Sequence, residues 1–279
     1  MPYFNDNDQS MYYRASGKGK DALLFIHGWY QNGAQAWSQQ MGRFEKKYQV
    51  FIPDLLGHGM SALENPEAFS IATNRRILLA FIDYIKKKYK VRRVVLLGHS
   101  YGAFAALDLA NEHTREIHGV VAMAAVDDYA PYVGELKKIL RIPFFFGFLY
   151  YRIQALVGLF PYGDRPLLYN KNTPSLYPSR LAYAKIKNKT LSLKNSRAYM
   201  SAFVSAKIKW SEKKIPLPLF LIYGNRDALT PVKHAARIRP HFNNASLLLV
   251  EDAGHNVQIS GAEKIEKPLL KFFEKCFRT

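Results

Sequence analysis

The stretch VVLLGHSYGAFAALDLA, residues 94–110, runs from four apolar residues through Gly-His-Ser-Tyr-Gly (98–102) into a helix-forming segment. A strand-to-helix turn this tight forces its central residue into a strained backbone conformation, and flanking glycines remove side chains that would clash. The pattern therefore predicts an accessible serine hydroxyl, that of Ser100, at the end of a strand. Glycine and serine are common residues, so the spacing alone is a modest signal, and the rest of the chain must decide.

Short apolar runs alternate with longer segments of helical periodicity along the chain. Such alternation is typical of a mostly parallel sheet covered by helices. Apolar residues also recur at helical spacing from Ile77 to Ile85, and lysines 86–88 follow where a helix dipole favours cations, which predicts a helix there. The expected strands lie at 22–26, 50–53, 93–97, 119–124, 218–223 and 246–250.

The alternation stops after Ala125, and residues 127–212 are rich in aromatic residues and lysines without a convincing buried strand. We therefore expect an α/β core formed by residues 1–126 and 213–279, with a helical cap inserted at 127–212. The insertion holds 14 lysines and arginines against 5 aspartates and glutamates, so it carries half of the formal net charge of +18. Its aromatic residues between 144 and 151 are expected to form the cap interior and to roof part of the pocket beneath it.

Composition limits the other classes of protein. The chain has 279 residues, 48% of them hydrophobic, enough for one large core. A single cysteine, Cys276, excludes an intrachain disulfide and a cysteine cluster for zinc, and together with the lack of a secretory signal it predicts a cytoplasmic protein. The most apolar segment, 139–160, is interrupted by two arginines and a proline, so no transmembrane helix is expected.

The strong positive charge would also fit a nucleic-acid-binding protein, because clustered lysines and arginines attract phosphates. The sequence contains no zinc-finger spacing, RNA-recognition signature or basic zipper, and its charges are interspersed with apolar residues. We therefore expect no nucleic-acid partner. A generally basic proteome or an anionic substrate explains the charge equally well.

Candidate partners for Ser100 follow two later strands. Asp227 lies in GNRDALTP just past one predicted strand, and His255 lies in AGHN just past the next. Both positions are at the carboxyl ends of strands, where open parallel sheets place their sites. Asp128 and Asp252 are alternative acids, whereas His255 alone among 8 histidines follows the last strand in a Gly-His turn.

At this point the chain resembles the α/β-hydrolase superfamily, and specifically its capped esterase-like members. The resemblance rests on five motifs in family order: HGW at 27–29, DLLGHGMS at 54–61, GHSYGA at 98–103, GNRDALTP at 224–231 and AGHN at 253–256.

The resemblance implies a role for each of five residues. Ser100 would be the nucleophile, His255 the general base and then acid, and Asp227 the residue that orients the imidazole. The backbone amides of Trp29 and Tyr101 would form the oxyanion hole. No metal or cofactor is required.

The expected function is hydrolysis of a small-molecule carboxylic ester or thioester of a largely apolar acyl group. Pimeloyl-carrier-protein methyl ester esterases are similar in their His-Gly-Trp motif, serine turn and helical cap, so an acidic acyl carrier protein is a candidate partner of the basic cap. Three alternatives of the same fold remain: a carbon–carbon bond hydrolase, an acyltransferase and a non-catalytic ligand receptor. The same three residues catalyse both enzymatic reactions, and a receptor can retain them.

Other residues near these motifs have structural explanations. Cys276 stands among phenylalanines and is expected to be a small core residue. Pro268 interrupts the last helical pattern, so we expect a break or restart of the helix there. The resemblance implies that His27 and His58 tie backbone groups of their loops together, and Asp54 and Ser61 are expected to fix the turn in DLLGHGMS. His99 is expected to point away from Ser100, and none of the three histidines is expected to be catalytic.

Overall fold

The computed structural model of the protein describes residues 2–7, 9–29, 31–61, 63, 65, 69–131, 198–199, 201–203 and 206–278. These residues build an 8-stranded sheet in the order β1-β2-β4-β3-β5-β6-β7-β8. Strand β2 pairs antiparallel with β1 and with β4, and all remaining neighbours are parallel. The strands are β1 (Tyr3–Asp6), β2 (Gln9–Gly17), β3 (Asp21–Ile26), β4 (Gln49–Pro53), β5 (Arg93–His99), β6 (Gly119–Met123), β7 (Ile215–Gly224) and β8 (Phe242–Val250).

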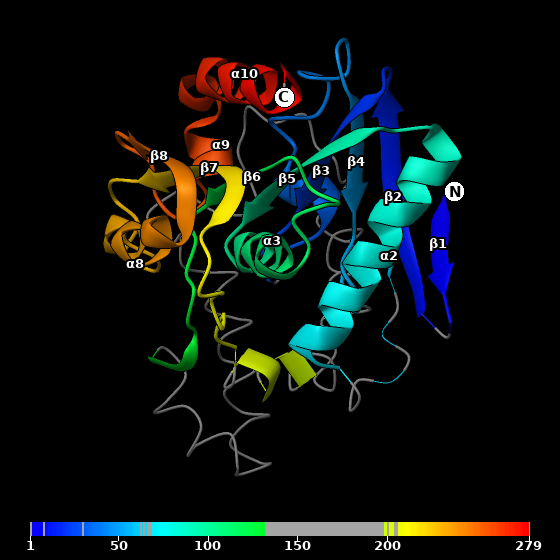
Figure 1. Ribbon diagram of the computed structural model, residues 1–279, viewed down its shortest axis with the longest axis horizontal. Coiled ribbons are helices and arrows are strands. Elements are labelled where there is room, and N and C mark those ends of the chain that lie inside the picture. The colour runs from blue at the N-terminus through cyan, green and yellow to red at the C-terminus, as the bar shows by residue number, and fades with distance from the viewer. Residues whose placement is uncertain are drawn as a thin grey trace, which may run out of the picture.

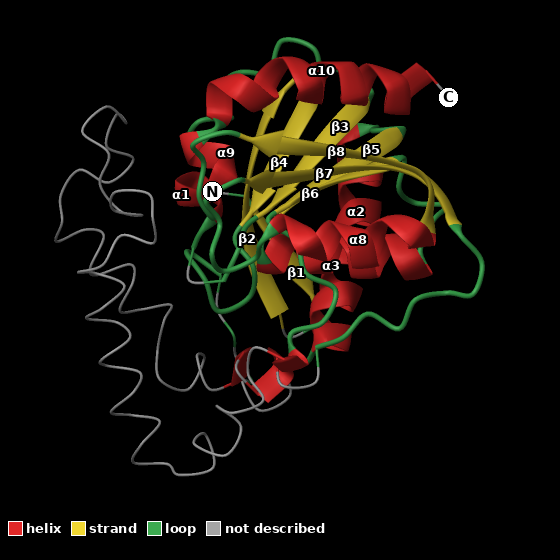
Figure 2. Ribbon diagram, turned by 90° about the vertical axis from the view of Figure 1, so that its left-hand side faces the viewer, coloured by secondary structure: helices red, strands yellow, loops and turns green. Residues whose placement is uncertain are grey.

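Helices cover both faces of this sheet, as expected for the α/β fold. Figure 2 shows α10 on one side of the strands and α2, α3 and α8 on the other. The helices are α1 (Gly33–Ala36), α2 (Ile71–Tyr89), α3 (Tyr101–Glu112), α8 (Ala235–Ile238), α9 (Val257–Ser260) and α10 (Ala262–Arg278), with short 3-10 turns η2 (Val232–His234) and η3 (Arg239–His241).

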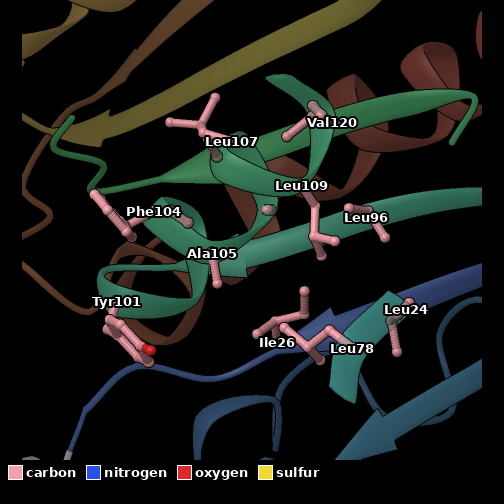
Figure 3. Packing of buried hydrophobic residues seen from close by; sticks show 14 of the residues in the cluster. Leu24, Ile26, Leu78, Leu96, Tyr101, Phe104, Ala105, Leu107, Leu109 and Val120 are labelled. Carbon is pink, nitrogen blue, oxygen red and sulfur yellow. The ribbon is translucent and has the colours of Figure 1, made fainter. Parts of the chain in front are cut away.

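The sheet separates two hydrophobic clusters. One lies between the strands and helices α2 and α3, where Figure 3 shows side chains such as Leu109 of α3, Leu96 of β5 and Leu78 of α2 in one layer. The other lies under α10 and includes Phe273 and Trp37. Successive side chains of a strand point to opposite faces of the sheet. Both faces of β3, β5 and β6 are covered, so nearly every residue of these strands is buried, and their sequences are continuous apolar runs.

Helix α2 forms where the helical periodicity predicts it. Its first turn is capped by Ser70, whose side chain accepts a hydrogen bond from the Thr73 amide. The predicted apolar residues from Ile77 to Ile85 are buried, and the helix ends at Lys90 in a left-handed conformation with φ 54°. Figure 1 shows this helix running alongside the β1, β2 and β4 end of the sheet.

The N-terminal hairpin of β1 and β2 lies outside the six predicted strands. In β2, buried and half-buried residues alternate from Gln9 to Tyr13, which is the two-residue period of a strand with one buried face. Polar residues on the other positions obscure this pattern in the sequence. The hairpin extends the sheet by antiparallel pairing of β2 with β4.

The predicted break at Pro268 is wrong, because α10 continues through that residue from Ala262 to Arg278. Proline inside a helix removes one hydrogen bond and costs roughly 3 kcal/mol. Buried side chains on both sides of it, including Ile265 and Phe273, hold the helix against the sheet. Each such side chain contributes roughly 1.5–3 kcal/mol, so their burial outweighs the lost bond.

Two backbone hydrogen bonds join the chain that leaves β6 to the chain that enters β7. The amide of Tyr129 donates to the Ala206 carbonyl across 2.8 Å, and the amide of Ile208 donates to the Asp127 carbonyl across 2.9 Å. The two segments form an isolated antiparallel bridge. The ends of the insertion are thereby held side by side.

Most of the insertion expected at 127–212 lies outside the described residues, which omit 132–197 entirely. The helical cap, its boundaries, its aromatic residues between 144 and 151 and most of its basic residues therefore stay predictions. The apolar segment 139–160 also lies there. Among the helices of the described ranges, none is both long and apolar enough to cross a membrane.

Candidate active site

Ser100 occupies a sharp turn between β5 and α3. Its backbone has φ 51° and ψ −115°, a strained combination for a residue other than glycine, as the Gly-x-Ser-x-Gly spacing predicts. Its amide donates to the Met123 carbonyl across 2.9 Å, and its carbonyl accepts from the Phe104 amide across 3.0 Å. The side chain makes no capping hydrogen bond to α3, so the turn leaves the hydroxyl free of that role.

The two flanking glycines are required by close approach of the backbone. A Cβ on Gly98 would come within 3.0 Å of the carbonyl oxygen of Gly102, a separation that real Cβ atoms essentially never show. A Cβ on Gly102 would come equally close to the carbonyl oxygens of Ile26 and His27. Residue 102 therefore packs the first turn of α3 directly against the end of β3, next to the loop that carries Trp29.

Asp227 and His255 form a hydrogen-bonded pair at the carboxyl ends of β7 and β8. Nδ1 of His255 lies 3.0 Å from Oδ2 of Asp227, and the Asp227 side chain is fully buried while 14% of the His255 side chain is exposed. A proton on Nδ1 leaves Nε2 unprotonated, which is the tautomer that a general base requires. The structure thus brings together two of the three residues predicted for catalysis.

The carboxyl group of Asp227 is held ionised by its neighbours. Burial alone raises the pKa of Asp227, but hydrogen bonding and charge from His255 and two hydrogen bonds from Thr230 lower it to about 2. One of the two Thr230 bonds runs from its amide to Oδ1 across 2.9 Å, and Oδ1 also accepts from the Leu229 amide across 2.8 Å. A carboxylate so held fixes one orientation of the imidazole and stabilises its positive charge.

The alternative acids have other partners. Asp252 is exposed over 66% of its side chain and pairs with Arg226. Asp128 is buried and pairs with Lys207 and Arg237 beside the antiparallel bridge. Asp227 is therefore the acid among these three that contacts His255.

His255 is also linked to the residue that precedes Ser100. Nε2 of His99 lies 2.9 Å from the His255 carbonyl oxygen, and the two imidazole rings have centroids 5.0 Å apart. The loop of the candidate base and the turn of the candidate nucleophile are thus in direct contact. The catalytic roles of Ser100, Asp227 and His255 stay predictions.

Trp29 and Tyr101, the candidate oxyanion-hole residues, contact the same phenyl ring. The ring centroid of Phe203 lies 4.8 Å from that of Trp29 and 4.9 Å from that of Tyr101. Tyr101 is fully buried at the start of α3, whereas Trp29 is half-buried. The positive end of the α3 dipole lies at Tyr101, where it would favour a developing negative charge.

Aromatic side chains from the end of the insertion cover this region. Tyr199 packs edge-on against Tyr101 and His58, and its hydroxyl donates to the Leu56 carbonyl across 2.6 Å. Phe203 also stacks on Tyr129, with centroids 5.0 Å apart. The described end of the insertion is therefore part of the core cluster beside Ser100.

The three histidines that were not expected to be catalytic, His27, His58 and His99, are buried and bond to loop groups. Nε2 of His27 accepts from the Leu55 amide across 2.9 Å, and its Nδ1 lies 2.8 Å from the Gly28 carbonyl oxygen. Burial lowers the pKa of His27, that of His58 to about 4 and that of His99 to about 3. Neutral, enclosed imidazoles of this kind hold backbone groups in place.

Asp54 and Ser61 fix the loop after β4, as expected. The Asp54 carboxylate accepts from the Gly33 amide across 2.7 Å and from the Met60 amide across 2.8 Å. The Ser61 hydroxyl donates to the Asp54 carbonyl across 2.6 Å. The bond from Gly33 ties the start of α1 to the loop that follows β4, and the other two hold that loop together.

Cys276 is a fully buried core residue beside Gly119, and burial raises the pKa of its thiol to about 12. This confirms the predicted packing role, because the reactive form of cysteine is the thiolate. Within the described part of the chain, no group of three or more His, Cys, Asp or Glu side chains is placed to hold a metal ion.

Three residues that contact the predicted catalytic loops were not anticipated from the sequence: Thr230, Gln31 and Asn256. The Thr230 hydroxyl donates to Oδ2 of Asp227 across 2.6 Å and lies 3.1 Å from Nδ1 of His255. An aspartate followed three residues later by threonine is a turn signal, so this contact could have been found. Gln31 and Asn256 bond to each other across 2.9 Å from positions 225 residues apart, and no local pattern announces such a pair.

Comparison with known proteins bears on the family and the fold. The sequence profile of a family described as the alpha/beta hydrolase fold matches residues 21–262. Protein ABHD8 of Bos taurus is 28% identical over 92% of this chain, which spans only 57% of that relative's length. A pimeloyl-[acyl-carrier protein] methyl ester esterase of Proteus mirabilis is 21% identical, with 94% of this chain and 95% of the relative covered.

Solved structures share the fold at low sequence identity. MGS-M2, an alpha/beta hydrolase enzyme from a Medee basin deep-sea metagenome library, superposes with a TM-score of 0.76 at 18% identity, covering 98% of this chain and 97% of the other. A thermophilic esterase from Thermogutta terrifontis has a TM-score of 0.71 at 18% identity, with 96% and 94% covered. The profile match over most of the chain, together with this fold, identifies the family: the chain belongs to the α/β hydrolases.

Proposed function

We propose that the protein is a serine hydrolase that cleaves a carboxylic ester or thioester through Ser100, His255 and Asp227. The observation that carries the proposal is the strained turn at Ser100, with φ 51° between β5 and α3 and no capping role for its side chain. Strain of about 1–3 kcal/mol in a folded protein is most often found at functional sites. The bonded pair of Asp227 and His255 supplies the base that such a serine needs.

The chemistry follows from the poor nucleophilicity of a serine hydroxyl at neutral pH. His255 takes the hydroxyl proton on Nε2 while Oγ of Ser100 bonds to the carbonyl carbon of the ester, and the carbonyl oxygen becomes an oxyanion. Collapse of this intermediate breaks the bond to the leaving oxygen or sulfur, which receives the proton from His255. Water then repeats the sequence on the acyl-enzyme and regenerates Ser100.

The backbone amides of Trp29 and Tyr101 would stabilise the oxyanion. Two donors fixed before the reaction need no reorganisation when the charge forms, and removal of one such donor typically costs about 3 kcal/mol. Their side chains share contact with Phe203, which keeps the two donors in one neighbourhood.

An apolar acyl group suits the described surroundings of the turn. The aromatic rings of Tyr101, Tyr199 and Phe203 pack together beside Ser100, and the half-buried Trp29 joins them. Aromatic and aliphatic walls with few polar groups are typical of sites for apolar ligands. The acyl chain would therefore leave water as it enters the site.

The test is covalent labelling by a fluorophosphonate probe together with turnover of p-nitrophenyl esters of short and medium acyl chains. We expect rapid labelling and ester hydrolysis by the wild type, and neither by Ser100→Ala. Absence of labelling, or labelling that survives Ser100→Ala, would contradict the proposal. Labelling without ester turnover would favour the non-catalytic receptor, or the carbon–carbon bond hydrolase if a diketone is cleaved instead.

Acyl transfer is tested in the same assay with an added alcohol or amine. A hydrolase releases free acid whatever acceptor is present, because water attacks the acyl-enzyme. A product that carries the added acceptor as its main form would identify an acyltransferase instead. Hydrolysis and acyl transfer both require Ser100, so the labelling experiment is carried out before the acceptor assay.

The second candidate function is methyl ester hydrolysis on an acyl carrier protein. Two observations favour it: the formal charge excess of the insertion at 127–212, with 14 basic against 5 acidic residues, and the similarity to the carrier-protein esterase of Proteus mirabilis. Carrier proteins are acidic, so a basic cap would raise their association rate through long-range attraction. Salt screens this attraction.

The carrier hypothesis predicts a selective effect of salt. Activity on a carrier-bound methyl ester should fall several-fold between low salt and about 0.5 M salt, because the Debye length shortens from well above 10 Å to a few ångströms. Activity on a free methyl ester of the same acyl chain should stay nearly constant. Equal responses of the two substrates would remove the basic cap as a docking surface.

A further inference from the structure

We propose that Gln31 is a positioning residue that holds three loops of the active site in one arrangement. The inference rests on the proposed function, since it assigns a role in that reaction. Gln31 lies in the loop between β3 and α1 and is only 9% exposed. Its side-chain amide is enclosed between the ends of strands that are far apart in sequence.

Three polar contacts define its place. Oε1 accepts a hydrogen bond from the Gly28 amide across 3.1 Å and lies 3.2 Å from Nδ1 of His99. Nε2 donates to Oδ1 of Asn256 across 2.9 Å. A single planar amide therefore contacts the loop after β3, the last residue of β5 and the loop after β8.

Each of these three partners is the sequence neighbour of a predicted catalytic group. Gly28 precedes Trp29, His99 precedes Ser100, and Asn256 follows His255. Gln31 thus touches none of the groups that react, yet it contacts the backbone or side chain adjacent to each of them. This placement suits a residue that sets the distances between nucleophile, base and oxyanion donor.

The imidazole of His99 completes the link to the base. Its Nε2 lies 2.9 Å from the His255 carbonyl oxygen while its Nδ1 faces Gln31. A neutral imidazole carries one N–H, so it donates to one of these two oxygens at a time. The bonds from Gly28 to Gln31 and from Gln31 to Asn256 do not depend on that choice, and they carry the argument.

The chain offers a matched control in Gln40. This glutamine is 3% exposed, and its Nε2 donates to the Gln258 carbonyl, so it also bonds to the segment that follows His255. In the contacts described for it, Gln40 has no bond to a neighbour of Ser100 or of Trp29. Replacement of either glutamine by methionine removes an amide of the same size from a buried loop.

The experiment compares Gln31→Met, Gln40→Met and Asn256→Ala in the full chain. Measurements are kcat and KM on a p-nitrophenyl ester, the rate of Ser100 labelling by a fluorophosphonate, and the thermal midpoint. We expect Gln31→Met to lower kcat and the labelling rate roughly tenfold to a hundredfold, with KM within about twofold, because small misplacements of reacting groups have effects of that size. Gln40→Met should lower the midpoint without this loss of kcat.

Asn256→Ala keeps the proposal testable if Gln31→Met does not fold. This variant should lower kcat by a smaller factor, roughly threefold to tenfold. The double variant should be no slower than Gln31→Met alone, since residues within one network are not additive. Independent, multiplying effects of the two substitutions would contradict a shared role.

The outcomes separate this role from the proposed function. A wild type whose labelling does not require Ser100 overturns the proposed function, and the role of Gln31 with it. Normal labelling of the wild type, with kcat unchanged in Gln31→Met, overturns the role of Gln31 alone. If Gln31→Met and Gln40→Met lose kcat equally, in proportion to their losses of stability, then Gln31 has a purely structural role.

Discussion

The hydroxyl of Thr230 donates to Oδ2 of Asp227 across 2.6 Å, the same oxygen that faces Nδ1 of His255. Thr230→Val removes this hydroxyl and keeps the shape of the side chain. We expect kcat/KM for ester hydrolysis to fall roughly tenfold, because a hydrogen bond to a charged group contributes about 1.5–3 kcal/mol and the backbone amide of residue 230 still binds the carboxylate.

Thr230→Ser is the control, since it retains the donor and loses only a methyl group. Its kcat/KM should stay within about threefold of the wild type. A valine variant as active as the serine variant would show that the backbone amides alone hold Asp227.

Gly102 packs against the carbonyl oxygens of Ile26 and His27, where an added Cβ would come within 3.0 Å of both. Gly102→Ala must push α3 away from β3, and backbone atoms yield less readily than side chains. We expect a loss of about 3 kcal/mol or more in the free energy of unfolding, measured by urea denaturation.

Gly42→Ala is the matched control for this prediction. Gly42 has φ +82° and no atom within 4 Å of an added Cβ, so the substitution adds backbone strain without a clash. It should cost only about 1–2 kcal/mol. A larger loss at Gly42 than at Gly102 would mean that crowding does not explain the glycine after Ser100.

The six predicted strands were found because each is an apolar run bounded by polar or turn residues, as in residues 93–97 within β5. Helix α2 was equally visible through its buried positions from Ile77 to Ile85. These signals are local, and burial on both faces of β3, β5 and β6, or along one face of α2, produces them directly. The edge strand β8 is an exception, because its apolar run includes the exposed Leu247 and Leu249. The antiparallel β2 gave a weaker signal because one of its faces is only half-buried.

The fine structure of the site depends on contacts that no local pattern encodes. Gln31 and Asn256 come together only after the sheet places the ends of β3 and β8 at one edge. The proline in α10 illustrates the same limit, since its local preference is overruled by buried neighbours such as Phe273. Local patterns predicted six strands and α2, and the resemblance to a known family supplied the roles of the candidate triad, while tertiary packing decided the residues around them.

The carboxyl group of Asp108 makes stability depend on pH. Burial in α3 raises its pKa to about 6, although the charge of Arg75 opposes the shift. The native state therefore holds a proton that the unfolded chain has released between about pH 4 and pH 6, so stability falls as pH rises through this window. Asp108→Asn should remove this fall in stability. The free energy of unfolding of the variant minus that of the wild type, measured by urea denaturation, should be higher at pH 7.5 than at pH 4.5 by about 1–3 kcal/mol.

Glu112→Gln is the control for this pH dependence. Glu112 contacts the same Arg75 at 3.7 Å, but 45% of its side chain is exposed. Its negative charge adds to the raised pKa of Asp108, so its substitution should reduce the fall in stability between pH 4.5 and pH 7.5 only in part, whereas Asp108→Asn removes it. An Asp108→Asn variant with the wild-type pH dependence would show that another group is responsible.

The choice of acid can be tested by comparing three carboxylates. Asp227→Asn keeps the size of the side chain but removes the charge that stabilises a protonated His255, and its amide can present a donor to Nδ1 and so favour the wrong tautomer. We expect kcat to fall roughly a thousandfold or more, measured on a p-nitrophenyl ester with labelling by the fluorophosphonate as a second readout.

Asp252→Asn and Asp128→Asn are the controls, because both aspartates were alternatives on sequence grounds. Asp252 forms an exposed pair with Arg226, which contributes at most about 1 kcal/mol, so its loss should leave kcat within about twofold. Asp128→Asn weakens the contacts with Lys207 and Arg237 and should lower stability more than kcat. A thousandfold loss in either control, with Asp227→Asn still active, would reassign the acid and require His255 to turn toward a different carboxylate.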